Sequence, residues 1–552
     1  MRRVFIAGCF LFLFITGKTQ VLPDSLTKKI DAIFKQWNYP VSPGCVIGII
    51  RNDSLIYTKG YGMANLEYSI PNSPTTIFHM ASISKQFTAY SVLLLANAGR
   101  LSLDDDIRKY LTWFPDLGQK ITIRQLMNHT SGIRDQWQLL AISGTRLDDV
   151  IKQDQIVKIL SRQQALNSAP GEKYNYCNSG YTMLAEIVKS VTGKTLRQYS
   201  DSAIFKPLGM TSTHFHDDYT EIEKNRAYSY QRYNMVQFSN SVLSYSNAGA
   251  TSLFTNMNDL SKWAMNYYTN KISSPEVIKQ LTQKGKLNSG KELNYALGIL
   301  VNDYKGNVQY SHGGADAGYR TFISVFPDLK MSFLVFSNLG DFSTNKIFAV
   351  ADFFVPDKTE KKETAKIDSA KAIVKDSAAV KKFLGNYISY DGNTASVELK
   401  DSKLMYKSNN SYKLLFKESE DRYSIPGQPG NECRFSISGK DTLVDFVTPQ
   451  ETFRLVKYRD IQINDDVLTK YTGSYYCPEL ECYYNIFLKN HELYLGNIKY
   501  DDSKLMLTGS DHLDVNFWWM DHLVMLRDKK GQITGFEVNS GRVEHLKFNK
   551  VK

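Results

Sequence analysis

Residues 78–85 read Phe-His-Met-Ala-Ser-Ile-Ser-Lys, and this stretch decides how the rest of the 552-residue chain is interpreted. Ser82 and Lys85 lie three residues apart at the start of an apolar pattern with helical spacing, which Gly99 ends. On a helix, residues i and i+3 share a face, so the lysine amine can lie beside the serine hydroxyl. The first turn of a helix also has free N–H groups that stabilise an oxyanion. We therefore interpret Ser82 as a nucleophile and Lys85 as its base.

The Ser-x-x-Lys pattern alone is weak evidence, because Ser25 with Lys28 and Ser343 with Lys346 match it too. A helix N-terminal serine followed by a solvated lysine is the ordinary alternative. The interpretation therefore depends on motifs further along the chain.

A polar loop at residues 170–180 precedes a predicted helix at residues 181–191. Tyr176 and Asn178 alternate in this loop, so both point the same way if the loop is extended. A tyrosine near an ammonium can relay a proton, and an asparagine amide can hold a substrate carbonyl or amide. The ordinary alternative is a helix-entry turn without a chemical role.

A third motif, His312-Gly313-Gly314-Ala315, ends a predicted strand. The glycines let a substrate backbone approach closely. A backbone N–H at this point can complete an oxyanion hole with the N–H of Ser82. The ordinary alternative is a packing or exposed histidine.

In this order, the motifs resemble those of the serine β-lactamase and penicillin-binding-protein superfamily. The branch holds class C β-lactamases, D-aminopeptidases, D-Ala-D-Ala carboxypeptidases and related esterases. Ser82-Ile83-Ser84-Lys85 resembles its first motif, Tyr176-Cys177-Asn178 its second and His312-Gly313-Gly314 its third. Two supporting stretches, residues 121–132 and 247–260, match as well.

The resemblance covers about residues 25–350 and implies an acyl-enzyme mechanism that needs no metal or organic cofactor. It implies that Lys85 takes the proton of Ser82, aided by a pKa that burial and Tyr176 lower. The N–H groups of Ser82 and Ala315 hold the oxyanion in this scheme. Tyr176 protonates the leaving group and helps to activate water, and Asn178 orients the acyl group.

His312 stands where true β-lactamases have the lysine of Lys-Thr-Gly, whereas peptidases and esterases of this branch often have His-x-Gly. A neutral imidazole recognises a free carboxylate more weakly than an ammonium does. We therefore expect a serine peptidase, amidase or esterase. Its substrates are small peptides, including D-amino-acid and peptidoglycan-derived peptides, or small esters.

A D-Ala-D-Ala carboxypeptidase or penicillin-binding protein is the second candidate, and a β-lactamase is the third. A non-catalytic alternative is an exported penicilloyl-binding sensor, or a scaffold whose β modules bind envelope glycans.

Strand patterns at both ends of a helical middle predict an α+β fold with an antiparallel sheet. Residues 44–50 and 54–57 read as a hairpin, and residues 309–312, 319–326 and 331–336 read as three more strands. The two chain ends of this domain are expected to close the sheet.

Composition divides the chain into five parts. They are a signal peptide at residues 1–20, the hydrolase domain at 21–356, a linker at 357–380, and two small antiparallel β-barrel modules at 381–460 and 461–552.

The two modules form a degenerate repeat, since Leu384-Gly385-Asn386-Tyr387 is echoed by Thr472-Gly473-Ser474-Tyr475. They resemble the lipocalin-like barrels of D-aminopeptidases, in which one barrel loop reaches towards the active site. The sequence identifies no equivalent loop, so gating the site and simple packing both remain open roles.

Composition also limits the partners and the compartment. The formal charge is +11, but the basic residues are scattered, which argues against nucleic-acid binding. No long apolar segment follows the leader, so we expect no integral membrane span. Only Cys477 and Cys482 are close enough to bridge, and no Cys/His spacing predicts a metal site. We expect an exported protein of the periplasm or the medium; the oligomeric state is open.

Overall fold

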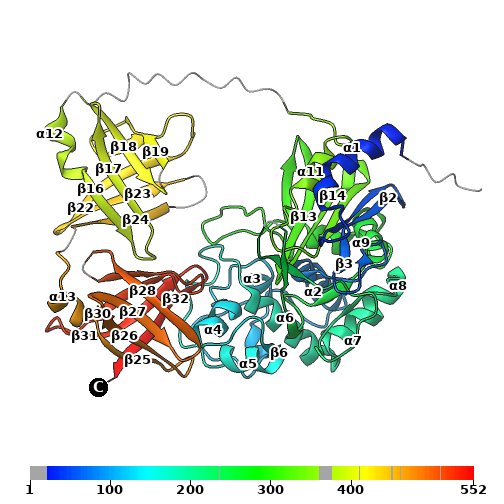
Figure 1. Cartoon of the computed structure of the whole chain (residues 1–552), viewed down its shortest axis with the longest axis horizontal. Coiled ribbons are helices and arrows are strands. Elements are labelled where there is room, and N and C mark those ends of the chain that lie inside the picture. The colour runs from blue at the N-terminus through cyan, green and yellow to red at the C-terminus, as the bar shows by residue number, and fades with distance from the viewer. Residues whose placement is uncertain are drawn as a thin grey trace, which may run out of the picture.

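Strands from both ends of the first domain lie side by side in one antiparallel sheet (Figure 1). β1 (Cys45–Arg51) pairs with β15 (Met331–Ser337). The strand order is β12-β13-β14-β15-β1-β2, and the other members are β2 (Ser54–Tyr61), β12 (Leu300–Tyr304), β13 (Asn307–Asp316) and β14 (Tyr319–Phe326). The predicted hairpin, the three predicted strands and the α+β fold are confirmed.

The computed structural model describes residues 22–234, 236–359, 374, 376–409, 411–448, 452–459, 462–509 and 511–551. The predicted signal peptide and most of the predicted linker lie outside these residues. No described helix is both long enough and apolar enough to cross a membrane.

Both faces of the sheet are buried, which explains the nearly continuous apolar run of β1. Ile47 and Ile49 belong to the core that contains residues of α1 (Asp24–Phe34) and α11 (Lys346–Ala351). Val46 points to the opposite face, into the larger core formed mainly by the helical region. The sheet is therefore packed on both faces, and the helical region that carries the predicted site residues packs against one of them.

The helical region is inserted between β2 and β12. Its helices are α2 (Ser84–Asn97), α3 (Ile123–Met127), α4 (Gln136–Ile142), α5 (Gln153–Leu160), α6 (Asn178–Thr192), α7 (Leu196–Ser200), α8 (Lys206–Leu208), α9 (Met257–Thr269) and α10 (Pro275–Leu281). Its short strands are β3 (Met63–Asn65), β4 (Ile70–Pro71), β5 (Phe78–His79), β6 (Val150–Lys152), β7 (His214–Phe215), β8 (Tyr230–Arg232), β9 (Phe238–Asn240), β10 (Ser244–Ser246) and β11 (Leu253–Thr255). Gly193, with φ of +72°, ends α6.

Two β modules follow, preceded by α12 (Ser377–Val380) and α13 (Asp465–Thr469) respectively. The first is a nine-stranded sheet of β16 (Gly385–Ser389), β17 (Thr394–Lys400), β18 (Lys403–Ser408), β19 (Ser411–Leu414), β20 (Phe416–Lys417), β21 (Arg422–Ser424), β22 (Glu432–Ser438), β23 (Asp441–Val447) and β24 (Thr452–Tyr458). The second is a closed barrel of β25 (Gly473–Cys477), β26 (Cys482–Lys489), β27 (Glu492–Asn497), β28 (Tyr500–Leu507), β29 (His512–Val515), β30 (His522–Arg527), β31 (Ile533–Ser540) and β32 (Val543–Val551).

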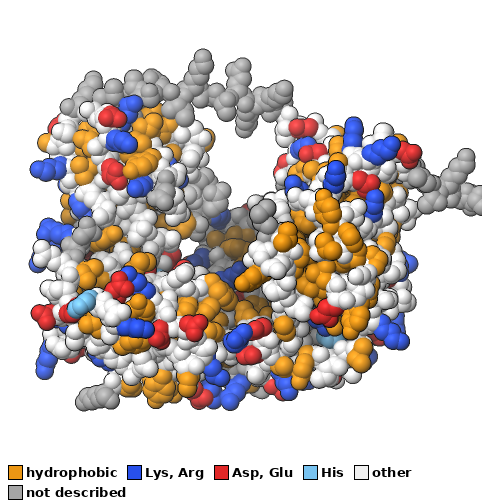
Figure 2. Space-filling view, viewed as in Figure 1, with side chains coloured by type: hydrophobic (Ala, Val, Ile, Leu, Met, Phe, Trp, Pro, Cys, Tyr) orange, Lys and Arg blue, Asp and Glu red, His pale blue; other side chains and the backbone are white. Residues whose placement is uncertain are grey.

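The second barrel lies against the helical region beside α4, whereas the first lies beyond it, with a hollow between the first module and the catalytic domain (Figures 1 and 2). Tyr390 of the first module donates a hydrogen bond of 2.5 Å to Glu537 of the second.

The sequence repeat is visible at atomic detail. Gly385 and Gly473 open equivalent strands with φ of +138° and +144°, and a Cβ at either would lie 2.8 or 2.7 Å from a lysine Cε. Two residues later, Tyr387 and Tyr475 each donate a buried hydrogen bond of 2.6 Å to the carbonyl four residues earlier. The shared motif thus fixes the start of each module.

The five cysteines among the described residues are all buried free thiols. Cys477 lies opposite Cys482 across β25 and β26, but the two are not bonded.

We predict that Tyr475→Phe lowers the free energy of unfolding by about 1 kcal/mol, because it removes a buried hydrogen bond and leaves a carbonyl unpaired. Urea denaturation measures the loss. Tyr483→Phe, at a side chain in the same barrel that is 55% exposed, is the control. Equal stability of the two variants would contradict the structural role of the repeat.

Candidate active site

Ser82 and Lys85 lie together as the sequence predicts. Ser82 is in a 3-10 turn, Ala81–Ile83, that runs directly into α2. Lys85 Nζ lies 2.9 Å from Ser82 Oγ. The spacing of three residues thus places Lys85 Nζ within hydrogen-bonding distance of Ser82 Oγ, as predicted.

The backbone before Ser82 is strained. Ala81 is fully buried and has φ of +48°, in the left-handed region that costs a non-glycine residue free energy. Thr321 of β14 donates a hydrogen bond of 2.9 Å to the carbonyl of Met80, so the sheet holds this turn in place.

All three donors of the Lys85 ammonium are used inside the protein. Besides Ser82 Oγ, they reach Asn178 Oδ1 and the carbonyl oxygen of Ala250, both at 2.8 Å. The lysine thus joins three segments that are far apart in the sequence.

Burial lowers the pKa of Lys85 to about 7, and the carboxylates of Asp316 and Asp135 partly oppose this shift. A pKa in this range leaves part of the Lys85 population uncharged at neutral pH, and an uncharged amine can accept the proton of Ser82. We expected Tyr176 to help lower this pKa, but it is not among its main causes.

Tyr176 lies against both reactive residues. Its hydroxyl lies close to Ser82, and burial raises the pKa of Tyr176 far above its usual value. Its ring centroid lies 5.0 Å from Lys85 Nζ, and the ring of His129 packs against it at 4.2 Å. Tyr176 therefore stays protonated and can donate a proton.

Asn178 is held from two sides. Its Oδ1 accepts from Lys85, while its side-chain and backbone nitrogens donate to Asp135 Oδ2 at 2.8 and 2.7 Å. Asp135 is buried and also caps α4 by accepting from the N–H of Trp137. Asn178 thus positions Lys85, and its contact with substrate stays a prediction.

His312 is a buried, neutral imidazole. Its Nδ1 lies 2.7 Å from the carbonyl of Gly313, which can only accept, so Nδ1 carries the proton. Its Nε2 then accepts from the hydroxyl of Tyr295 at 2.9 Å. Burial, helped by the charge of Lys85, lowers the pKa of His312 to about 4. His312 brings no positive charge to the site at neutral pH.

The packing around Gly314 itself requires a glycine. A Cβ there would lie 2.3 Å from the carbonyl oxygen of Met80 and from Thr321 Oγ1. Glycine therefore lets β13 pack against the turn that carries Ser82, and the close approach of a substrate backbone here stays a prediction. Ala315 follows on the same strand and is exposed, and its N–H stays the predicted second donor to the oxyanion.

The two supporting stretches position the motif residues. His129, from residues 121–132, accepts from the N–H of Cys177 at 3.1 Å and so fixes the loop that carries Tyr176. Ala250, from residues 247–260, supplies the third acceptor for Lys85.

A turn of the second barrel reaches this site, which the sequence did not reveal. The turn is Gly541-Arg542, between β31 and β32. The Arg542 guanidinium carbon lies 4.9 Å from the Tyr176 ring centroid, and Nη1 lies 3.9 Å from Asp135 Oδ2. The side chain is 44% exposed. The barrel thus adds a permanent positive charge, which also lowers the pKa of Lys85.

Polar contacts fix this turn on the catalytic domain. The carbonyl of Arg542 accepts from Asn167 Nδ2 at 2.8 Å, and its N–H donates to Gln138 Oε1 at 2.5 Å. Nearby, the buried guanidinium of Arg134 pairs with Glu479 of the barrel at 2.6 Å. The turn that carries Arg542 is therefore attached to the catalytic domain, and these contacts fix the position of the Arg542 backbone.

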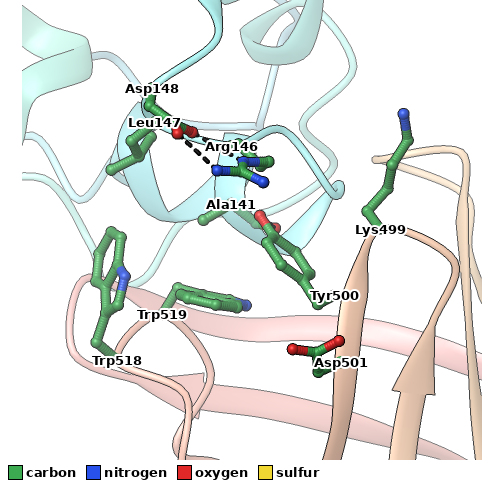
Figure 3. Close-up of a pocket in the computed structure, with 9 residues that line it drawn as sticks. All are labelled: Ala141, Arg146, Leu147, Asp148, Lys499, Tyr500, Asp501, Trp518 and Trp519. Carbon is green, nitrogen blue, oxygen red and sulfur yellow. Dashed lines mark hydrogen bonds and ion pairs between the residues drawn. The ribbon is translucent and has the colours of Figure 1, made fainter. Parts of the chain in front are cut away.

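A pocket of about 370 Å³ lies at the same interface but is separate from the site (Figure 3). Tyr500 contacts the carbonyls of Ala141 and Thr145 at 3.0 Å, and Trp518 and Trp519 form a corner beside it. None of the predicted site residues lines this pocket.

Sequence reasoning missed a second group of buried residues behind the nucleophile. His79 Nε2 lies 3.0 Å from Asp316 Oδ2, and Thr251 donates to the same carboxylate. His79 stood in the opening stretch, but nothing in the sequence linked it to Asp316. Asp135 did leave a signal, as an aspartate directly before a helix.

Comparisons with known proteins agree with this geometry. Residues 30–349 match the family model described as Beta-lactamase. The chain is 25% identical over 421 residues to penicillin-binding protein 4* of Bacillus subtilis (71% of this chain, 90% of that protein). It is 24% identical over 535 residues to a D-aminopeptidase of Brucella anthropi (92% of this chain, 96% of that protein). An octameric penicillin-binding protein homologue from Pyrococcus abyssi has a similar fold, with a TM-score of 0.52 and 23% identity, covering 78% of this chain and 99% of that one.

We predict that Asp135→Asn shifts the pH dependence of Ser82 labelling by a fluorophosphonate. The labelling rate rises as Lys85 loses its proton, and removing a carboxylate that raises the pKa of Lys85 moves this rise to lower pH, by roughly half to one unit. Asp148→Asn, at an exposed aspartate near α4, is the matched control. A rise that stays in place or moves to higher pH contradicts this electrostatic link.

Proposed function

The chain belongs to the Beta-lactamase family, and on this premise we propose that it is a serine hydrolase that cleaves amide or ester bonds of small peptides or esters through an acyl-enzyme. The observation that carries the proposal is the contact of 2.9 Å between Ser82 Oγ and the buried amine of Lys85. D-Amino-acid peptides are included because a relative that spans both β modules is a D-aminopeptidase.

In the acylation step, neutral Lys85 takes the proton of Ser82 as Oγ attacks the substrate carbonyl carbon. The N–H groups of Ser82 and Ala315 hold the resulting oxyanion. Collapse of the tetrahedral intermediate breaks the bond to the leaving amine or alcohol, which receives a proton from Tyr176. Lys85, now an ammonium, returns a proton to Tyr176 through the hydrogen bonds around Ser82.

In the second step, water attacks the ester carbonyl of the acyl-enzyme. Its proton passes to the Lys85–Tyr176 pair and then back to Ser82 Oγ, which leaves as the hydroxyl. Each turnover therefore consumes one water and restores the starting protonation state, and the residues named here supply all the proton transfers.

The neutral state of His312 supports peptidase, amidase or esterase activity over β-lactamase activity, because β-lactams present a free carboxylate. Arg542, however, favours a second candidate. A guanidinium that is half exposed beside Tyr176 can pair with a carboxylate of the substrate, as in peptides that end in D-Ala-D-Ala. The second candidate is therefore a D-Ala-D-Ala carboxypeptidase that takes its cation from the barrel.

The leader-like sequence at residues 1–20 supports export to the periplasm or the medium. Peptidoglycan-derived peptides are then the substrates at hand. Export is tested by locating the chain in cell fractions with and without residues 1–20; equal distribution of the two forms contradicts it.

We predict that a fluorophosphonate or a fluorescent penicillin labels the wild-type chain and that Ser82→Ala abolishes the labelling. Lys85→Met leaves Ser82 in place without its base, so its labelling should fall by about 10²-fold or more. Ser25→Ala, which removes the serine of a chance Ser-x-x-Lys match, is the matched control. The proposal is contradicted if neither probe labels the wild type and neither nitrocefin nor p-nitrophenyl esters are hydrolysed. That result would favour the non-catalytic binding-protein alternative.

We predict that Arg542→Gln acts selectively on substrates with a free carboxylate. We would compare D-Ala-p-nitroanilide, p-nitrophenyl acetate and a D-Ala-D-Ala peptide in both forms. Loss of the guanidinium should lower kcat/KM for the D-Ala-D-Ala peptide about 10-fold or more relative to the acetate ester. Arg434→Gln, at an exposed arginine paired with Glu432 in the first module, is the control.

Equal loss on all three substrates would show that Arg542 acts only through Lys85 or the interface. A wild type that strongly prefers the D-Ala-D-Ala peptide would favour the second candidate over the first.

A further inference from the structure

Two histidines and a glutamate outside the catalytic site bring three metal-binding atoms together. His214 and His216 lie two residues apart on the edge strand β7 and its continuation, so their side chains share a face. His214 Nε2 lies 3.3 Å from His216 Nδ1 and 3.5 Å from Glu223 Oε2. All three atoms lie within 4.8 Å of one another.

These separations fit a tetrahedral ion. Zinc bonds of about 2.0–2.1 Å in tetrahedral geometry place neighbouring ligand atoms about 3.3–3.4 Å apart. The two distances from His214 Nε2 are close to this length. The remaining distance, between the ligand atoms of His216 and Glu223, would have to shorten by rotation of the Glu223 carboxylate. That side chain is 18% exposed and lines a pocket.

Two carboxylates, Glu221 and Glu223, lie beside the two histidines, and the guanidinium of Arg197 lies beside Glu221. Glu221 lies 3.8 Å from His216 but is already held by Arg197 through two short hydrogen bonds. Glu221 is therefore not counted as a ligand, and Glu223 supplies the carboxylate that can bind the ion.

We propose that His214, His216 and Glu223 form a zinc-binding site whose fourth position is open to solvent. His214 and Glu223 both line a neighbouring pocket of about 480 Å³. Two imidazoles and one carboxylate are ligands that suit Zn²⁺ rather than Ca²⁺ or Mg²⁺. The sequence predicted no metal site, because nothing in the spacing singles out Glu223 as the third ligand.

A bound zinc ion would stabilise the segment that packs beside the Ser82 stretch, without contacting Ser82 itself. The segment that carries Glu223 continues to Asn225, whose carbonyl accepts from the N–H of Ile77 at 2.9 Å. Ile77 leads directly into β5 and the stretch that contains Ser82. A bound ion would join this segment to β7, so we expect zinc to stabilise the fold. Zinc binding does not depend on the proposed function, and Ser82→Ala should bind it equally.

The test is zinc titration of the full, untagged chain by calorimetry, with thermal unfolding as a second measurement. We expect one Zn²⁺ per chain and a rise in Tm of roughly 3–6 °C at about 100 times the Kd. His216→Ala and Glu223→Gln should each weaken binding 10-fold or more. Glu223→Gln is nearly isosteric, so it keeps the test valid if the histidine variant folds poorly.

His491→Ala is the matched control, since His491 is an exposed histidine paired with Asp465 at 2.8 Å in the second barrel. Co²⁺ in place of Zn²⁺ should give the visible absorption of a tetrahedral site, lost in Glu223→Gln. The proposal is overturned if the wild type binds no zinc, or if the variants bind it as tightly as the control; in that case His214 and His216 merely share a proton.

Discussion

The buried amine of Lys85 is the interaction on which the rest of the site depends. Its three hydrogen bonds reach the predicted nucleophile Ser82, the first turn of α6 at Asn178 and the carbonyl of Ala250. Burial that removes water from this amine also lowers its pKa to about 7. The packing that buries Lys85 in the core therefore also lowers the pKa of this predicted base. Burial thus contributes both to the stability of the fold and to the proposed reactivity of Lys85.

The motifs on the main elements were predictable because their signals are local. The Ser-x-x-Lys spacing, the loop before α6 and the strand before Gly314 each follow from periodicity and turn residues, and their order in the chain carried the family resemblance. Asp135, Asp316 and Arg542 were missed because each acts through a contact between segments far apart in sequence. The packing role of Gly314 was also missed, since its contact with Met80 is visible only in three dimensions.

The second barrel is part of the site rather than an appendage. Arg134 and Gln138 hold it against the catalytic domain, and the turn they support carries Arg542 to Tyr176. His312 supplies no charge, whereas Arg542 of the second barrel brings a guanidinium to 4.9 Å from the Tyr176 ring centroid. A family scaffold can in this way keep its reaction and change its substrate through a neighbouring module.

The central claim, that Ser82 is acylated with Lys85 as base, is tested most directly by trapping the intermediate. A slowly hydrolysed ester is mixed with the chain at about pH 5 and about pH 9, quenched in acid and digested for mass spectrometry. The account predicts the acyl mass on the peptide containing Ser82, forming much faster at the higher pH. An adduct on another residue, or equal rates at both pH values, would contradict it.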